Sequence, residues 1–268
     1  MSNAIIVKPL PWASISASST AAGYDPAYTG NDHMGVVWKT EAGAATRTIT
    51  VDMGADVRID AALLLGCTGA SAAWTLKVQA ATAAQGSSFS QLSYDSGDAP
   101  FLAGSVAPTS NRGRALWLPS SPAAIPSARY WRFVISGLGA AAVTVGRLIL
   151  GRRIQLARNF QFGAAFGVRD LSTLDFSQYG VLLRRRGVKL RTVGISFGHT
   201  RRDEVEAKVQ PLIEEVGNSE PIALITDPDA HEQRQNRIYF GPLVGDLSTI
   251  WNKPDGFEWR ASLVSLNA

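Results

Sequence analysis

The sequence predicts a mostly β protein built from two modules. Short apolar runs alternate with polar residues at a period of two, turn-forming Gly and Pro residues separate them, and only one segment has helical periodicity. With 268 residues, 46% of them hydrophobic and 18% charged, the chain is long enough for one or two full cores. We expect a β-sandwich or jelly roll over 1–150, a linker over 151–159, and a small β-sandwich or barrel with one packed helix over 160–268.

The first 150 residues are rich in Ala, Ser, Thr and Gly and carry the clearest alternation. Leu76 and Val78 alternate with Lys77 and Gln79, which is the pattern of a half-buried strand. Turn-forming segments with Gly and Pro separate such runs, as a sandwich requires. Strands are expected over 48–53, 59–65, 75–80, 130–135 and 143–150.

The composition becomes Arg-rich over residues 151–160, and we place the boundary between the modules there. Residues 180–198 indicate two strands around an Arg-Gly turn. Further strands are expected over 221–230, 237–243 and 257–266.

One segment, 203–216, has the periodicity of an amphipathic helix. Thr200 and Asp203 resemble a capping box at its start, Pro211 should kink or divide it, and Gly217 should end it. The apolar stripe that we expect to be buried consists of Val205, Val209, Leu212, Ile213 and Val216.

The net charge of +4 is unevenly distributed along the chain. Residues 151–202 carry a net charge of +9, and residues 203–268 carry −7. A nucleic-acid-binding protein usually has a basic face without so large an acidic counterpart. Either the two blocks meet between copies of the chain, positive against negative, or they neutralise each other within one fold.

Candidates for chemistry are few. His33, His199 and His231 are isolated and have no second ligand at metal-binding spacing, and we interpret His231, in a polar loop, as solvated. The single cysteine, Cys67, excludes an intramolecular disulfide and is expected to be a buried, inert thiol. Asp227 and Asp229 flank Pro228, which indicates a turn rather than a pair of catalytic carboxylates.

Motifs of hydrolases, metalloproteases and phosphate-binding loops are also missing from the sequence. We therefore predict no catalytic, cofactor-binding or metal site, and a protein that is not an enzyme. No apolar run approaches the length of a membrane span, and the start of the chain lacks the features of a signal peptide.

Arg184, Arg185 and Arg186 form the sharpest local feature. They could contact DNA that passes through a tube, or they could lie on a hairpin arm at a subunit interface. No aromatic residues interleave with them as stacking platforms, which favours the interface. Their candidate partners in a neighbouring copy are the acidic residues Asp203, Glu204 and Glu206.

Aromatic residues gather in the loop-like N-terminal region. We expect Trp38 to belong to the core. Trp12, Tyr24 and Tyr28 could either contact a glycan or close the end of the sandwich core.

The first module resembles the discoidin-type (coagulation factor 5/8 C-terminal) jelly roll. The family's terminal cysteine pair is absent here, so a disulfide-closed version is excluded. Family members often bind carbohydrate or lipid through variable loops, and no loop residue is carried over to this chain. The pieces that carry the resemblance, in order, are SISASST, GYDPAYTGND, VVWKTE, RTITVDMGADVRIDAALLLG, WTLKVQAA, SYDSG, SARYWRFVISG and VTVGRLILG.

The layout of the whole chain resembles tail-tip (baseplate, distal-tail-like) proteins of siphophages and prophages. A strand–helix–strand sandwich of this kind is the ring-forming fold of tail tubes. In the better-known distal tail proteins the ring-forming domain comes first, so the order in this chain is reversed. That departure bears on the specific assignment to distal tail proteins more than on the assignment to baseplate components.

The resemblance implies a structural protein of the virion, assembled in the host bacterial cytoplasm and located at the tail tip. Residues 160–268 would form a homo-oligomeric ring of hexamer scale, and 1–150 would project outward. Its partners would be tail-tube and baseplate proteins and a host surface glycan, with nucleic acid only as DNA passing through the ring. The alternative is a carbohydrate-binding or adhesion protein that acts through the first module.

Overall fold

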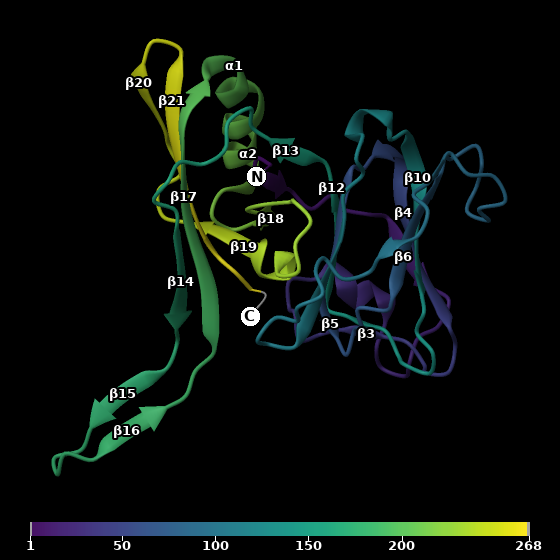
Figure 1. The fold of residues 1–268 in the computed structure, drawn as a ribbon, viewed down its shortest axis with the longest axis horizontal. Coiled ribbons are helices and arrows are strands. Elements are labelled where there is room, and N and C mark those ends of the chain that lie inside the picture. Colours follow the sequence, from purple (N-terminus) through teal and green to yellow (C-terminus); the bar gives the residue numbers. More distant parts are fainter. Residues whose placement is uncertain (1, 267–268) are drawn as a thin grey trace.

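The computed structural model describes residues 2–266 and is mostly β, as predicted. Figure 1 shows two modules side by side, with a β-sandwich on one side and a curved sheet with a helical segment on the other. A long two-stranded arm projects from the second module, away from the sandwich.

Two facing sheets form the sandwich. Its larger sheet has the order β2 (Ser14–Ala17), β4 (Thr46–Arg58), β10 (Ser127–Ser136), β6 (Thr75–Ala81) and β7 (Tyr94–Asp95), with β8 (Ala99–Pro100) also paired to β6. Its smaller sheet has the order β12 (Arg147–Gly151), β5 (Ala61–Thr68) and β9 (Arg112–Trp117), and β3 (Trp38–Lys39) pairs with β11 (Thr144–Val145) nearby.

Alternation fixes the register of the larger sheet. In β10, Trp131, Phe133 and Ile135 are fully buried, while the residues between them are partly exposed. Phe133 stands opposite Ile49 of β4 and Val78 of β6, so the three strands present one apolar face to the core. The strands predicted from alternation in this module are confirmed.

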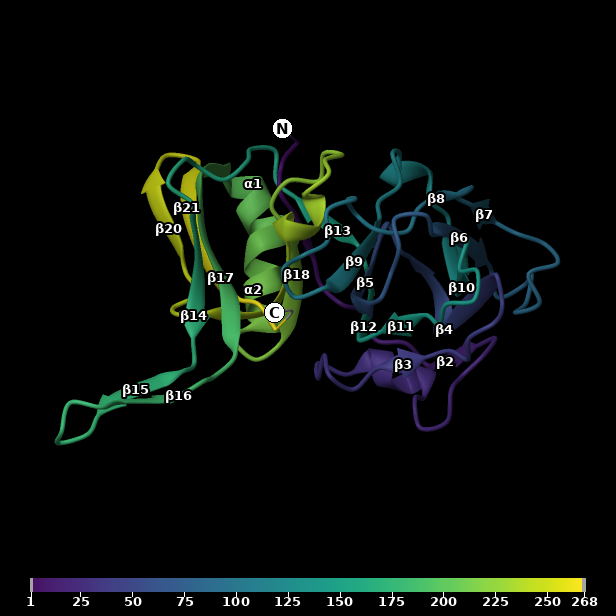
Figure 2. The same cartoon turned by 60° about the horizontal axis from the view of Figure 1, so that its bottom comes forward.

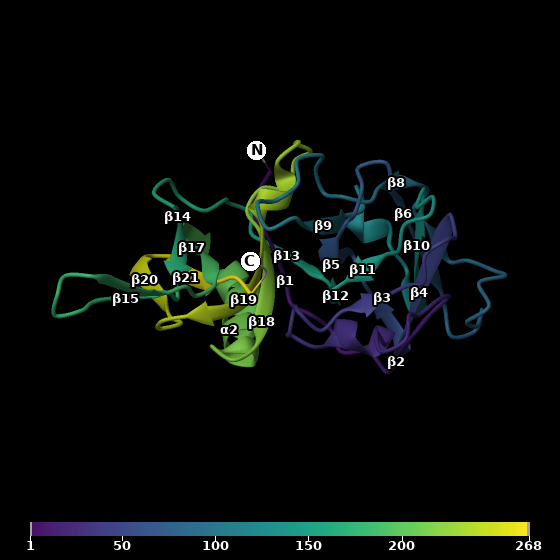
Figure 3. The same cartoon turned by 90° about the horizontal axis from the view of Figure 1, so that it is seen from below.

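The smaller sheet is buried on both of its faces. Leu64 of β5 packs in the sandwich core, whereas Leu63 and Leu65 pack in a second core shared with the C-terminal sheet. The second core also contains Ile225 of β18 and Phe240 of β19. The junction between the modules is therefore a hydrophobic core in its own right. Figure 3 shows the strands of the two modules from below.

The second module is a sheet of eight strands that curves around the helical segment. That segment lies between β17 and β18 in Figure 2. The strand order is β13 (Arg153–Gln155), β1 (Ile5–Val7), β18 (Pro221–Ile225), β19 (Ile238–Val244), β21 (Gly256–Val264), β17 (Lys189–Arg201) and β14 (Ala165–Asp170), with β20 (Thr249–Lys253) paired to β21.

The structure corrects two predicted boundaries. Ile5–Val7 was assigned to the first module, but β1 lies between β13 and β18 in the second. Residues 151–159 are not a linker, because only Arg152 separates β12 from β13. The physical reason is that β1 is buried on both faces. Ile6 packs in the core between the second-module sheet and the helical segment, called the helix-side core. Ile5 and Val7 pack in the core shared by the two modules, called the junction core. The sandwich is thus inserted between two neighbouring strands of the second module.

The helical segment occupies 202–216, close to the prediction, in three pieces. These are α1 (Arg202–Glu204), a π-helical turn (Val205–Val209) and α2 (Gln210–Val216). The wide turn directly precedes Pro211, whose ring and missing N–H disturb an α-helical ladder. Four residues of the predicted stripe are buried and Ile213 is partly buried.

The ends of this segment differ in how well they were predicted. Gly217 ends it as expected, with φ of +53° and its N–H donated to the carbonyl of Ile213. The predicted capping box is wrong, because the N-cap is Arg201 and has no side-chain cap hydrogen bond. Thr200 instead lies in β17, where it pairs with Phe257 of β21.

Polar groups also hold the two modules together. Gln235 is fully buried and accepts the backbone N–H of Arg114 at 2.9 Å, while its amide donates to the carbonyl of Val106 at 3.1 Å. Gly104 approaches the backbone of Glu232 so closely that a Cβ there would lie 2.3 Å from its carbonyl oxygen. The modules therefore meet through matched backbone contacts as well as apolar side chains.

Candidate assembly surface and candidate ligand pocket

The projecting arm consists of β15 (Thr173–Phe176) and β16 (Leu182–Arg185), joined by a turn at 177–181. The arm runs on in the direction of β14 and β17, past the ends of the other strands of the sheet, as Figures 1 and 2 both show. The prediction that 180–198 forms two strands around an Arg-Gly turn is wrong in its pairing, since β16 pairs with β15 and β17 pairs with β14 and β21.

A glycine at the base of the arm allows its two strands to approach each other. A Cβ on Gly187 would lie 2.4 Å from the backbone carbonyl carbon of Leu171. The base is held by two hydrogen bonds, from Leu171 N–H to the carbonyl of Val188 and from Gly187 N–H to the hydroxyl of Ser172. Gly187, which was predicted to form a turn, therefore lies where the two strands approach each other at the base of the arm.

One face of the arm is apolar. Directly opposed residues share a face, and the register pairs Leu174 with Arg184 and Phe176 with Leu182. Leu174, Phe176 and Leu182 are 66%, 67% and 50% exposed, although they would be core residues in an ordinary strand. The other face carries Thr173, Asp175, Leu183 and Arg185.

The arginine triplet lies on a hairpin arm, as predicted. Arg184 and Arg185 point to opposite faces of β16, and Arg186 follows the strand. All three are exposed, and within residues 2–266 none of their side chains forms an ion pair or a hydrogen bond. Their contact with a neighbouring chain stays a prediction.

The acidic residues suggested as their partners lie at the opposite end of the module. Glu204 accepts hydrogen bonds from Lys208 and from the backbone N–H of Ala157, and Glu206 is paired with Arg202 at 2.7 Å. Asp203 lines a surface pocket of about 580 Å³ that also contains several basic residues. Part of the acidic block is therefore neutralised within the chain, whereas the arginines of the arm are not.

An apolar groove of about 700 Å³ opens at the start of β14. Phe160, Phe166 and Tyr239 line it, and the rings of Phe166 and Tyr239 lie 6.4 Å apart. Phe162 on its rim is fully exposed. Sequence reasoning missed this groove, because it joins segments more than 60 residues apart.

The structure separates the three aromatic residues predicted to contact glycan. Trp12 is half-buried and lines a pocket of about 600 Å³ with Asp32 and Arg147. Tyr24 and Tyr28 are exposed and lie outside that pocket. Trp38 is fully buried in the sandwich core, as predicted.

Charged groups define the polar side of the Trp12 pocket. Arg147 donates to the carbonyl of Thr29 at 3.2 Å, pairs with Asp32 at 3.3 Å, and its guanidinium carbon lies 5.9 Å from the Trp12 ring centroid. Burial lowers the pKa of Arg147, and the charge of Asp32 opposes that effect. An indole beside a fixed guanidinium and a carboxylate suits a polar ligand with an apolar face.

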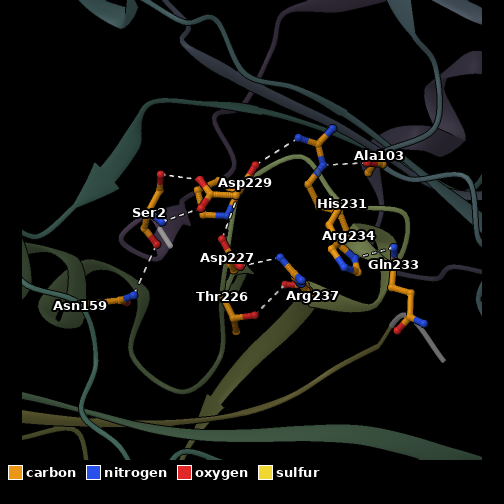
Figure 4. A network of polar contacts seen from close by, with 11 residues as sticks. Ser2, Ala103, Asn159, Thr226, Asp227, Asp229, His231, Gln233, Arg234 and Arg237 are labelled. Atoms are coloured by element: carbon orange, nitrogen blue, oxygen red, sulfur yellow. Dashed lines mark hydrogen bonds and ion pairs between the residues drawn. The ribbon is translucent and has the colours of Figure 1, made fainter.

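Asp227 and Asp229, considered above as a pair of carboxylates, are held by contacts within the fold. Asp227 pairs with Arg237 and Asp229 accepts from Ser2 at 3.0 Å, so the two carboxylates are held separately, as Figure 4 shows. Across residues 2–266 no three metal-ligating side chains gather, and no described helix is long and apolar enough to cross a membrane.

The three histidines and the cysteine were also given roles by the sequence. His231 lies in an exposed loop, where its ring nitrogen accepts from the Gln233 N–H. His33 and His199 are also exposed. Cys67 is buried and free, as predicted, and burial raises its pKa to about 12.

No protein-family model and no curated protein matches this chain. Among solved structures, the lectin domain of lectinolysin with Lewis b antigen has 16% identity and a TM-score of 0.38, covering 52% of this chain and 92% of that one. The family 32 module of NanJ from C. perfringens, in complex with galactose, has 14% identity and a TM-score of 0.39, covering 55% and 98%.

A GH29 fucosidase from Ruminococcus gnavus is also similar, at 13% identity and a TM-score of 0.39, covering 53% of this chain. This chain spans only a quarter of the fucosidase's length. All three TM-scores are below 0.5, so the ligands and activities of these proteins are not transferred to this chain.

Proposed function

We propose that this chain is a structural subunit that assembles with copies of itself through the projecting arm. The observation that carries the proposal is the apolar face of the arm. Soluble proteins rarely leave Leu and Phe side chains exposed on a two-stranded hairpin unless another chain covers them. The arm also carries three arginines without ion-pair partners in the described chain, which would orient the contact.

The specific setting that we propose is the tail tip of a bacteriophage. Its support is the layout of the chain, together with an arm and a sandwich that extend from opposite sides of the second module (Figure 1). The second module would form a ring, and the inserted sandwich would face outward. Electron microscopy of purified chain tests this setting, because a ring with sandwiches on its circumference is expected, whereas irregular chains or fibres would contradict it.

Light scattering after size-exclusion chromatography tests the assembly itself. We expect the wild-type chain to form an oligomer and the triple variant Leu174→Ser, Phe176→Ser, Leu182→Ser to be a monomer. The matched control is Ile250→Ser with Trp251→Ser, which removes two exposed apolar side chains of the same module outside the arm. A wild-type chain that stays monomeric at high concentration would refute the proposal.

A second candidate function is carbohydrate binding by the inserted sandwich, favoured by the pocket at Trp12. Its aromatic ring, guanidinium and carboxylate are the groups that recognise the apolar face and hydroxyls of a sugar. A glycan array with wild-type protein should give binding that Trp12→Ala abolishes and Tyr28→Ala retains. Binding that depends on Tyr28 and not on Trp12 would place the site elsewhere.

A further inference from the structure

We propose that the apolar groove at the start of β14 receives the arm of a second copy of this chain. This inference rests on the proposed assembly function and names the surface that completes it. The groove and the arm are two places in the second module where aromatic and aliphatic side chains lie open together, and Ile250 and Trp251 of β20 form another.

The groove is an open end of the helix-side core. Phe166 stands opposite Val193, a buried residue of that core, and therefore shares its face of the sheet. Phe160 packs edge-on against the buried Phe197, with ring centroids 6.3 Å apart. The core thus continues outward to Phe166, which is 56% exposed beside Tyr239, and to Phe162, which is fully exposed.

The arm offers a matching shape and chemistry. Its apolar face presents Leu174, Phe176 and Leu182 side by side on a narrow two-stranded ribbon. A ribbon of this kind can lay three side chains into an elongated groove, as an added strand does at an open sheet edge. The groove lies beside β14, which pairs only with β17 among the described strands and so has one open edge.

Charge is compatible with the same pairing. One wall of the groove is formed by Thr226, Asp227 and Arg237, and Asp227 is paired with Arg237. Residues 226–237 together hold three acidic residues and two arginines. The arm holds three arginines and a single acidic residue, Asp175. Arg184 lies on the apolar face of the arm, so it would enter next to this wall, where it would share Asp227 with Arg237.

The occupant has to be another copy rather than the arm of the same chain. The groove lies at the start of β14, and the arm leaves from its far end, after Asp170. The strand between them is paired with β17 over Ala165–Asp170, about 20 Å at the usual rise per residue. Figures 1 and 2 show the arm directed away from this end of the sheet.

A contact between arm and groove joins two different surfaces, so it is heterologous and can repeat from subunit to subunit. If the rotation between neighbours closes, a ring results, and if it does not, a filament results. The geometry therefore gives the proposed assembly a direction, because each subunit donates one arm and accepts one.

Cysteine cross-linking tests the contact on the full chain. The native Cys67 is fully buried, so it leaves a clean background. One preparation carries Phe176→Cys on the arm, and a second, with a different tag, carries Phe162→Cys on the groove rim. After mixing and mild oxidation we expect a disulfide-linked heterodimer, at least tenfold more abundant than with Leu92→Cys, an exposed apolar position on the sandwich.

Three outcomes would overturn the inference. A dominant Phe176→Cys homodimer would indicate arm-to-arm contact, equal linkage to Leu92→Cys would indicate random collision, and no linkage would indicate that the groove is unused or binds another protein. A second variant, Phe162→Ser with Phe166→Ser, separates the two proposals. If it assembles like wild type while the arm triple variant is monomeric, the arm mediates assembly but the groove does not receive it. If the wild-type chain is itself monomeric, the proposed function fails as well.

Discussion

β5 and the arm are both short apolar β segments, yet they are packed in opposite ways. β5 is buried on both faces, because Leu64 packs in the sandwich core and Leu63 packs in the core shared with the second module. The arm is exposed on both faces, although Leu174, Phe176 and Leu182 are three of the four paired residues on one of them, with Arg184 as the fourth. β5 has both of its partners within the chain, whereas the arm lacks one in the described residues. An apolar strand therefore identifies a packing surface, but it does not show whether the residues that cover it belong to the same chain or to another one.

The largest expected effect comes from placing the same charge in both segments. Leu64→Asp would bury an unpaired carboxylate and should lower the free energy of unfolding by about 4 kcal/mol. Leu182→Asp should leave the stability of the isolated chain almost unchanged, because that residue is half exposed. Urea denaturation of a monomeric background measures both. Equal losses for the two variants would show that the arm is packed in the free chain.

The junction between the modules should be the next most sensitive place. Gln235→Ala removes the acceptor of the Arg114 N–H and the donor to the carbonyl of Val106, all of them buried or partly buried. Leaving such groups unpaired typically costs about 1–3 kcal/mol. Thermal unfolding should show a lower Tm, while the neighbouring exposed Gln233→Ala serves as control and should not change it. An unchanged Tm for Gln235→Ala would mean that apolar packing alone holds the junction.

The arginines of the arm should affect assembly rather than folding. Arg184→Glu, Arg185→Glu and Arg186→Glu together reverse the local charge and should weaken the oligomer at low salt without lowering Tm. Exposed charges more than about 8 Å apart are largely screened at physiological ionic strength, and more salt shortens that distance. Added salt should therefore weaken the wild-type oligomer and partly rescue the variant. Light scattering at two salt concentrations measures this. If the variant assembles as well as wild type at low salt, the charge blocks act only within one subunit.

The smallest effect is expected on the solvent-facing side of the sandwich. Arg129 donates two hydrogen bonds to Asp52, at 2.7 and 2.9 Å, and this pairing lowers the pKa of Asp52 below its ordinary value of 3.8. The stabilisation is fully present above that value and is lost as the pH falls through the lowered pKa. Arg129→Met should therefore lower Tm slightly at pH 7 and not at pH 2. A difference that persists at pH 2 would assign the effect to packing of the arginine stem.

Alternation along the sequence was sufficient for the sandwich but not for the second module. The strand around Trp131 and Phe133 was predicted because one of its faces is wet, which leaves a period of two. β1 was assigned to the wrong module because Ile5, Ile6 and Val7 are all buried, so no period marks the strand or its sheet. Which strands pair is a tertiary property, and three residues cannot encode it locally.

The candidate sites show the same limit. The sequence identified Arg184 to Arg186 and Trp12 as unusual, and the structure places the arginines on an exposed arm and Trp12 in a pocket. The sequence could not show that β16 pairs with β15. An Arg-Gly step is typical of a turn, and nothing in the sequence indicates that Gly187 packs against the backbone of Leu171. The groove could not be foreseen at all, since Phe166 and Tyr239 meet only after the sheet has formed.

The position of the sandwich between β1 and β13 has a consequence for how such a protein can change. Val7 and Arg153 are partners in register, so the two ends of the insertion leave the host sheet side by side. Adjacent ends allow such a domain to be lengthened or exchanged while the order of the host strands is kept. Any replacement has to cover the core at the junction, which includes Ile225 and Phe240. Selection can therefore replace the inserted domain while the strand order of the host module is kept.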